Sequence, residues 1–203
     1  MIKVVLASSN PGKLKEFSAI LADADIAMVP QSEFGVPDAE EPHATFVENA
    51  LAKARHASRL TGLPALADDS GLCVDTLGGA PGVYSARFAQ RAGGDKSDAA
   101  NNRHLTELLQ SHDDRSASYV AVLVYVSAAD DPRPIIAEGS WAGQIIDTPR
   151  GDNGFGYDAH FYLPDLGKTV AELAPAEKNA ISHRATALKR LVQALRCRQH
   201  PVS

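Results

Sequence analysis

Cysteine is scarce in this chain, with only Cys73 and Cys197 among 203 residues. The two are far apart and form no CxxC or Cys/His spacing, so neither a disulfide framework nor a zinc site is expected. Long apolar runs are also lacking. The longest, at 119–126, is far shorter than the roughly 20 residues of a membrane-spanning helix, and the start of the chain lacks the blocks of a secretory signal. We expect a cytoplasmic protein without a membrane partner.

An excess of basic residues is lacking as well. The formal net charge is −5 and the isoelectric point is about 5.8, whereas a broad nucleic-acid surface needs many lysines and arginines. Nucleic acid is therefore not an expected partner, and any bound phosphate must be held by a few local groups. With 44% apolar and 22% charged residues, the chain has an ordinary globular composition. We expect one domain over residues 1–203, with two lobes.

The start of the chain predicts a strand, a loop and a helix. An apolar, β-branched run at 2–7 ends in the turn formers of 8–12, and apolar residues then recur at helical spacing from close to Lys13. A second helix is indicated by a T-x-x-E capping box that begins at Thr45, followed by an Ala-rich segment that ends at Gly62.

Strands and helices continue to the end of the chain. A buried strand is expected at 119–126. Shorter strands are expected at 65–67 and 72–74, on either side of a polar turn at 68–71, and at 135–141, 143–146 and 160–163. Helices are expected at 97–111 and after Ser182, which is suited to an N-cap. The mixture predicts an α/β fold with a mixed sheet.

The first loop is a candidate anion site. Ser8, Ser9 and Asn10 offer side-chain donors, Gly12 permits close approach, and Lys13 stands at the positive end of the following helix. The alternative is a plain capped turn, which is favoured in isolation because the loop lacks a Walker spacing.

Carboxylates form a second candidate site. Glu40, Glu41, Asp68 and Asp69 are expected in loops at the entry to a helix and the end of a strand. Mg²⁺ prefers such oxygens, and usually takes one or two carboxylates with substrate phosphates and waters. Solvated acidic residues are the alternative for any one pair, although the apolar neighbours of Asp69 favour a partly enclosed site.

The glycine-rich segment near the end forms a third candidate site. The rings of Phe155 and Tyr157 could stack on a flat base while Asp158 reads its edge, or the aromatics could instead fill the core of a hairpin. Lys178 and His183 bring cationic and hydrogen-bonding groups to the start of the expected last helix.

Six motifs occur along the chain in a fixed order. They are SSNPGK at 8–13, TFVENA at 45–50, ADDSGLCVD at 67–75, GGAPGVYSAR at 78–87, GFGYD at 154–158 and EKNAISHR at 177–184. In this order they resemble the Ham1-like family of inosine and xanthosine triphosphate pyrophosphatases, over nearly the whole chain. The resemblance implies an elongated mixed β-sheet with flanking helices, two lobes around a central substrate cleft, and a homodimer.

The same resemblance implies an activity and its residues. Non-standard purine nucleoside triphosphates (ITP, dITP and XTP) would be hydrolysed to monophosphate and pyrophosphate, a house-cleaning reaction that keeps them out of DNA and RNA. Mg²⁺ is the implied cofactor, with water attacking between the α and β phosphates. Asp69 is the implied catalytic base and, with Glu41, a metal ligand. The implied substrate-binding residues are Ser8, Ser9, Asn10, Pro11, Gly12, Lys13, Lys53, Ser70, Phe155, Gly156, Tyr157, Asp158, Lys178, His183 and Arg184.

Within that set, the resemblance assigns residues 8–13 and Lys53 to the phosphates, and residues 155–158 with the group at 178–184 to the base. The chain departs from the family pattern where Pro42-His43 follows the paired glutamates, since Thr-Gly is usual there. Either Glu40 or Glu41 could therefore be the metal ligand.

Two other functions stay open from the sequence. A non-catalytic nucleotide sensor would bind the same ligands without forming product, although a binder has little need of a carboxylate beside a metal. A phosphatase of the Maf-like septum-inhibitor group would act on pyrimidine or modified nucleotides. The SHR segment at 182–184 and the GFGYD loop favour the purine interpretation.

Overall fold

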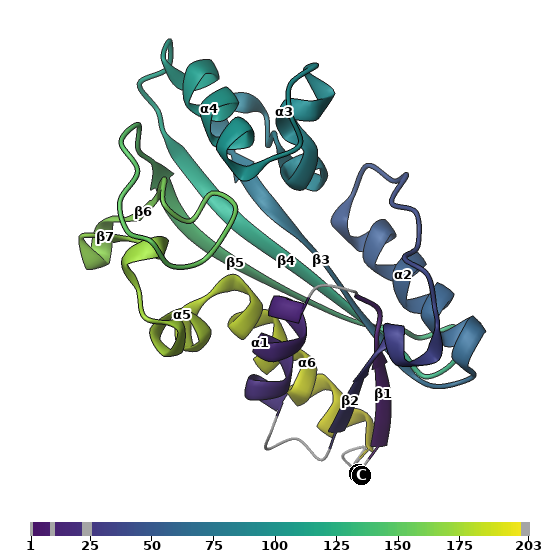
Figure 1. Cartoon of the computed structure of the whole chain (residues 1–203). Helices are drawn as coiled ribbons and strands as arrows, with labels where there is room; N and C mark the ends of the chain where they lie inside the picture. Colours follow the sequence, from purple (N-terminus) through teal and green to yellow (C-terminus); the bar gives the residue numbers. More distant parts are fainter. Residues whose placement is uncertain (1, 9–10, 22–25, 200–203) are drawn as a thin grey trace. The chain divides into compact units, whose positions relative to one another are not determined.

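The computed structural model describes residues 2–8, 11–21 and 26–199 (Figure 1). Its strands are β1 (Ile2–Leu6), β2 (Ile26–Pro30), β3 (Ala65–Val74), β4 (Ser116–Val126), β5 (Ile135–Ile145), β6 (Phe161–Leu163) and β7 (Lys168–Thr169). These described strands form one seven-stranded sheet in the order β2-β1-β3-β4-β5-β6-β7. β1 pairs in parallel with β2 and β3, whereas β6 pairs antiparallel with β5 and β7. The expected α/β fold with a mixed sheet is confirmed.

The α-helices are α1 (Pro11–Leu21), α2 (Phe46–Thr61), α3 (Phe88–Arg91), α4 (Asp98–Leu109), α5 (Pro175–Ile181) and α6 (His183–Gln199). Short 3-10 turns are η1 (Gln31–Phe34), η2 (Asp75–Leu77), η3 (Gly82–Arg87), η4 (Pro164–Leu166) and η5 (Val170–Glu172). The predicted ends of α2 are confirmed, because the Thr45 hydroxyl accepts the Glu48 amide at 3.4 Å and Gly62 adopts a left-handed conformation. No helix among the described residues has both the length and the apolar character that a bilayer span requires.

Two compact units make up the chain. Unit 1 comprises residues 1–69, 121–139 and 184–203, and unit 2 comprises residues 70–120 and 140–183. The unit boundaries fall within β3, β4 and β5, so each unit contains part of each of these strands. One domain with a substrate cleft between two lobes stays a prediction.

The core of unit 1 is formed by strand residues and the apolar faces of α1 and α6. Val4 and Leu6 of β1 join Phe17 of α1 and an apolar stripe of α6, including Leu188 and Leu191, in one buried cluster. Because side chains alternate along a strand, Val5 of β1 faces the opposite side of the sheet from Val4 and Leu6. Figure 1 draws α2 on that other side of β1, and its buried positions include a row of alanines, namely Ala50, Ala54 and Ala57.

Unit 2 has its own core. Leu72 and Val74 of β3, Leu105 and Leu109 of α4, and Phe161 of β6 are buried together, each less than 1% exposed. Ser97 caps α4, its hydroxyl accepting the Ala100 amide at 3.1 Å, so the helix predicted at 97–111 is confirmed with slightly shorter bounds.

Two predicted strand breaks are wrong. β3 runs unbroken through the acidic segment at 68–71, because the two aspartates have cationic partners and the backbone stays extended. β5 likewise continues through Ala142, between the two strands expected there. A Cβ on the next residue, Gly143, would lie 2.6 Å from the Tyr162 carbonyl oxygen, so this glycine permits close approach of β6.

Some elements were not predicted at all. β2, β7 and α5 are short, and α5 ends directly before Ser182. Ser182 lies between the two helices, and α6 begins directly after it as expected. Lys178 therefore belongs to α5, whereas His183 and Arg184 begin α6.

Candidate active site

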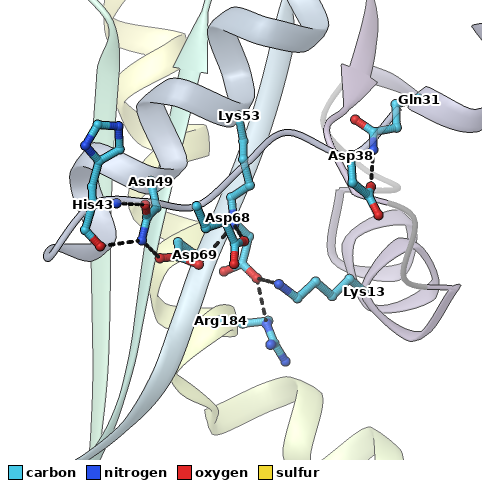
Figure 2. A network of polar contacts seen from close by, with 10 residues as sticks. Lys13, Gln31, Asp38, His43, Asn49, Lys53, Asp68, Asp69 and Arg184 are labelled. Atoms are coloured by element: carbon cyan, nitrogen blue, oxygen red, sulfur yellow. Dashed lines mark hydrogen bonds and ion pairs between the residues drawn. The ribbon is translucent and has the colours of Figure 1, made fainter. Parts of the chain in front are cut away.

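A fully buried carboxylate on β3 joins two cations in unit 1. The Asp68 side chain has no exposed surface, and its Oδ2 lies 2.7 Å from Lys13 Nζ and 3.4 Å from Arg184 Nε (Figure 2). Burial alone would raise the pKa of Asp68, but the Lys13 and Arg184 charges outweigh burial and hold this pKa well below its usual range. Asp68 therefore fixes side chains from both ends of the chain in one place.

The next residue, Asp69, lies in a second cluster of the same unit. Lys53 of α2 bridges two carboxylates, with its Nζ 3.0 Å from Asp69 Oδ1 and 2.7 Å from Glu41 Oε1. Asn49, one turn earlier on α2, donates its amide to Asp69 Oδ2 at 3.2 Å. Asp69 and Lys53 are both buried, at 7% and 8% exposed.

The charges in this second cluster alter its protonation. Burial raises the pKa of Asp69 above its ordinary value, and the negative charge of Glu41 adds to that rise against the opposing effect of Lys53. For Lys53, burial favours the neutral amine, but Asp69 and Glu41 outweigh it and raise its pKa. A buried carboxylate with a raised pKa is a suitable proton acceptor near neutral pH.

The structure also bears on the two glutamates at the entry to α2. Glu40 is exposed, whereas Glu41 is partly buried and contacts Lys53. Asn49 fastens the loop beside them, because its Oδ1 accepts the His43 amide at 3.0 Å and its Nδ2 donates to the His43 carbonyl at 3.3 Å. The Pro42-His43 departure thus accompanies a loop that is held to α2, with Glu41 facing the cluster.

The predicted phosphate loop is only partly described. Ser9 and Asn10 lie outside the described residues, as does the side chain of Pro11. Ser8 follows β1 and is partly buried, and Gly12 is exposed in the first turn of α1. Lys13, in that same turn, is brought to Asp68.

Glu41 and Asp69 fit the donor set expected for Mg²⁺. Both carboxylates contact one ammonium group, so together they already stabilise a positive charge between them. Among the described side chains, no group of three or more His, Cys, Asp or Glu is placed to hold a metal ion. Two carboxylates are enough where substrate phosphates and waters complete the coordination.

In unit 2, the two aromatic residues of the GFGYD loop have different environments. Phe155 is 50% exposed, whereas Tyr157 is 3% exposed and donates its hydroxyl to the Ser85 carbonyl at 2.8 Å. Tyr157 thus matches the core alternative, and Phe155 is the ring available for stacking. Gly156 between them is held by α4, where Asp98 accepts its amide at 2.7 Å and Asn102 donates to its carbonyl at 2.8 Å.

Asp158 connects the remaining predicted base-binding residues of unit 2. Its carboxylate accepts from Lys178 Nζ at 2.7 Å and from the Phe155 amide at 3.0 Å. Lys178 also lies under the Phe155 ring, 4.9 Å from its centroid. His183 is 4% exposed and stacks on Tyr119, with ring centroids 5.0 Å apart.

The predicted site residues therefore gather into two groups, one in each unit. Arg184, assigned by resemblance to the base, contacts Asp68 in unit 1, and Ser70 is partly buried on β3 in unit 2. The sequence-based site omitted Asn49 and Tyr119. An asparagine inside an Ala-rich helix was a usable signal for Asn49, since asparagine is a poor interior helix former; Tyr119 lies within an apolar run and gave none.

An α/β fold with a lysine-bridged carboxylate pair and a second cluster of aromatic and hydrogen-bonding groups suits an enzyme that acts on a phosphate-bearing ligand. The model of the Ham1 family matches residues 4–194 of the chain. This protein belongs to the Ham1 family.

Known relatives cover nearly all of the chain. A dITP/XTP pyrophosphatase from Ralstonia nicotianae is 71% identical over 196 residues, which are 97% of this chain and 98% of that protein. A dITP/XTP pyrophosphatase from Burkholderia pseudomallei is 68% identical over 193 residues, covering 95% and 93%. The structure of a HAM1 protein from Coxiella burnetii matches with a TM-score of 0.90 and 51% identity, covering 97% of this chain and 99% of that one.

Proposed function

We propose that this protein hydrolyses the non-standard purine nucleoside triphosphates ITP, dITP and XTP to the corresponding monophosphate and pyrophosphate. The observation that carries the proposal is the 71% identity, over 97% of the chain, with a protein named dITP/XTP pyrophosphatase. Removal of these nucleotides keeps inosine and xanthosine out of DNA and RNA.

The unit 1 clusters supply the groups for phosphate chemistry. Hydrolysis between the α and β phosphates requires a directed water and neutralised charge on both sides of the breaking bond. Asp69 orients the water and accepts its proton, a role supported by its burial and raised pKa. Lys53 and Lys13 neutralise phosphate oxygens, and Asp68 holds Lys13 in position.

Mg²⁺ is the proposed cofactor, and Glu41 with Asp69 would hold it. When bound, the ion would neutralise charge on the phosphates. Because Lys53 contacts the same two carboxylates, it keeps them together when no ion is bound and limits their mutual repulsion.

The unit 2 cluster supplies the groups for base recognition. Phe155 is exposed enough to stack on a purine ring. Lys178 and His183 carry donors that suit the 6-oxo group of hypoxanthine and xanthine. Against the 6-amino group of adenine these donors would stay unpaired. This would weaken binding of adenine nucleotides and favour 6-oxo purines by several-fold to many-fold.

Two further properties complete the proposal. We expect a homodimer, as the resemblance implies, and a cytoplasmic location, in keeping with two free cysteines, Cys73 and Cys197. Light scattering coupled to size-exclusion chromatography measures the first directly: a mass of one chain would remove the dimer from the proposal.

Product analysis tests the proposed activity. Purified protein with Mg²⁺ is offered ITP, dITP, XTP, ATP and GTP, and pyrophosphate is assayed separately from orthophosphate. We expect monophosphate and pyrophosphate from the first three and little product from ATP or GTP. Chelation should abolish turnover, and added Mg²⁺ should restore it.

Other outcomes identify the alternatives. Orthophosphate as the product would indicate a phosphatase, and nucleotide binding without any product would indicate a sensor. Full turnover in the presence of a chelator would remove the metal from the mechanism while leaving the substrate assignment intact.

A further inference from the structure

The Asp158 carboxylate is occupied within the protein on both of its oxygens. Oδ1 accepts the Tyr119 hydroxyl at 3.0 Å, while Oδ2 accepts Lys178 Nζ at 2.7 Å and the Phe155 amide at 3.0 Å. The Asp158 side chain is 5% exposed. A carboxylate offers about four acceptor positions, so three internal donors leave it little capacity to read a base. Its contacts instead suit a group that holds other residues in place.

Tyr119 reaches the same residues by a second route. It lies on β4, 8% exposed, and its ring stacks on His183 with an interplanar angle of 13°. Its ring also contacts Phe161, at a centroid distance of 4.5 Å. One side chain therefore contacts His183 through its ring and Asp158 through its hydroxyl.

We propose that Tyr119 is a positioning residue for base recognition, which holds Lys178 and Phe155 through Asp158 and holds His183 through ring stacking. The proposal rests on the proposed function, because it assigns Tyr119 to the base side of that activity. Fixing Lys178, Phe155 and His183 before the ligand arrives reduces the ordering cost of binding. The effect should therefore fall on affinity for the base and not on the phosphate chemistry.

Packing alone does not account for the hydroxyl. A phenylalanine ring at position 119 would keep the ring contacts with Phe161 and His183 and would lose the hydrogen bond to Asp158. The chain offers a matched control on the same strand, since Tyr125 is also 8% exposed and lies in the core of unit 1. Tyr119→Phe and Tyr125→Phe thus remove the same atom from two equally buried rings.

The test compares these two variants with the wild-type protein. For Tyr119→Phe we expect KM for dITP and Kd for inosine monophosphate to rise about tenfold, the effect of losing one hydrogen bond to a charged group. The kcat and the inhibition by inorganic pyrophosphate should stay close to wild type, whereas the melting temperature should fall by a few degrees because a buried carboxylate loses one donor. Tyr125→Phe should change none of the ligand constants.

A double-mutant cycle identifies the route. If Tyr119 acts through Asp158, then Tyr119→Phe should add little to the effect of Asp158→Ala, which removes the acceptor, on inosine monophosphate affinity. Fully additive effects would overturn the route through Asp158. Equal constants for Tyr119→Phe and Tyr125→Phe would overturn the proposal, and so would a parallel loss of kcat and pyrophosphate inhibition.

The same measurements separate this proposal from the proposed function. Wild-type protein that binds inosine monophosphate without hydrolysing dITP would contradict the function, while the ratio of Kd values for Tyr119→Phe and wild type would still decide the role of Tyr119. If the wild-type protein hydrolyses dITP but binds no inosine monophosphate, the proposed function stands, and KM for dITP in Tyr119→Phe and Tyr125→Phe decides the role of Tyr119.

Discussion

The two candidate clusters differ in how they are held together. In unit 1, carboxylates and cations pair directly, as in Asp68 with Lys13 and Asp69 with Lys53; Asp68, Asp69 and Lys53 are buried and Lys13 is partly buried. In unit 2, one carboxylate, Asp158, lies among rings and backbone amides, with Lys178 as its cationic partner. Dense charge suits phosphate chemistry, whereas rings and fixed donors suit recognition of a base. The comparison predicts that unit 1 variants change rate and stability, and that unit 2 variants change affinity and selectivity.

The largest expected effect is on the rate. Asp69→Asn removes the proposed proton acceptor while keeping its size, so kcat for dITP should fall by about a hundredfold to ten-thousandfold. Steady-state pyrophosphate release measures this loss. Asp113→Asn, which makes the same change at an exposed position, should keep wild-type activity. Activity of Asp69→Asn above half of wild type would remove Asp69 from its role.

The next largest effect is on the free energy of unfolding, through the buried charge of Asp68. Asp68→Asn leaves the charges of Lys13 and Arg184 without their buried partner, so the free energy of unfolding should fall by about 3 to 5 kcal/mol. Asp147→Asn is the control, because Asp147 is 64% exposed in its ion pair with Arg115 and should cost less than about 1 kcal/mol. Urea denaturation measures both. Equal losses would show that burial of the charge does not matter here.

Acid should weaken unit 1 through a carboxylate outside the candidate site. Burial opposes ionisation of Asp131, but hydrogen bonds from Ser127 and Arg133 and the charge of Arg198 hold its pKa at about 2. A lowered pKa in the folded protein contributes stability at neutral pH, about 2 kcal/mol, which is lost as the pH falls from about 4 to 2. Asp131→Asn should lower stability at pH 7 and flatten that acid dependence. An unchanged slope between pH 4 and 2 would contradict this assignment.

The smallest effect tests unit 2. Asn102→Ala removes the donor to the Gly156 carbonyl and loosens the loop that carries Phe155. KM for dITP should rise about fivefold, the effect of one neutral hydrogen bond, with kcat unchanged. Arg103→Ala, at the adjacent exposed position of α4, is the control. A fall in kcat with constant KM would show instead that the loop acts in catalysis rather than in binding of the base.

Local patterns predicted much of the fold. Capping residues such as Thr45 and Ser97 give their helices the expected starts, because caps depend on neighbours three residues away. The continuity of β3 could not be predicted locally. Its acidic segment looks like a turn until Lys13, Lys53 and Arg184, which come from distant parts of the sequence, neutralise it.

Only the site residues that lie within the six motifs could be predicted from the sequence. Glu41, Lys53 and Asp69 come together as the resemblance implied. The partner of Arg184 and the stacking of His183 on Tyr119 are tertiary contacts, and neither a spacing nor a residue type in the sequence indicates them. Tyr119 in particular stands in a buried apolar strand, where a tyrosine and a phenylalanine fit the same pattern.

The division of labour between the units is tested most directly by one ratio, kcat/KM for dITP divided by kcat/KM for dATP. It is measured for wild type, for Glu41→Gln in unit 1 and for Lys178→Met in unit 2. We expect Glu41→Gln to lower both values and to leave the ratio unchanged, whereas Lys178→Met should lower the ratio because the donor to the 6-oxo group is lost. A ratio that falls in Glu41→Gln and stays constant in Lys178→Met would contradict these separate roles of the two units.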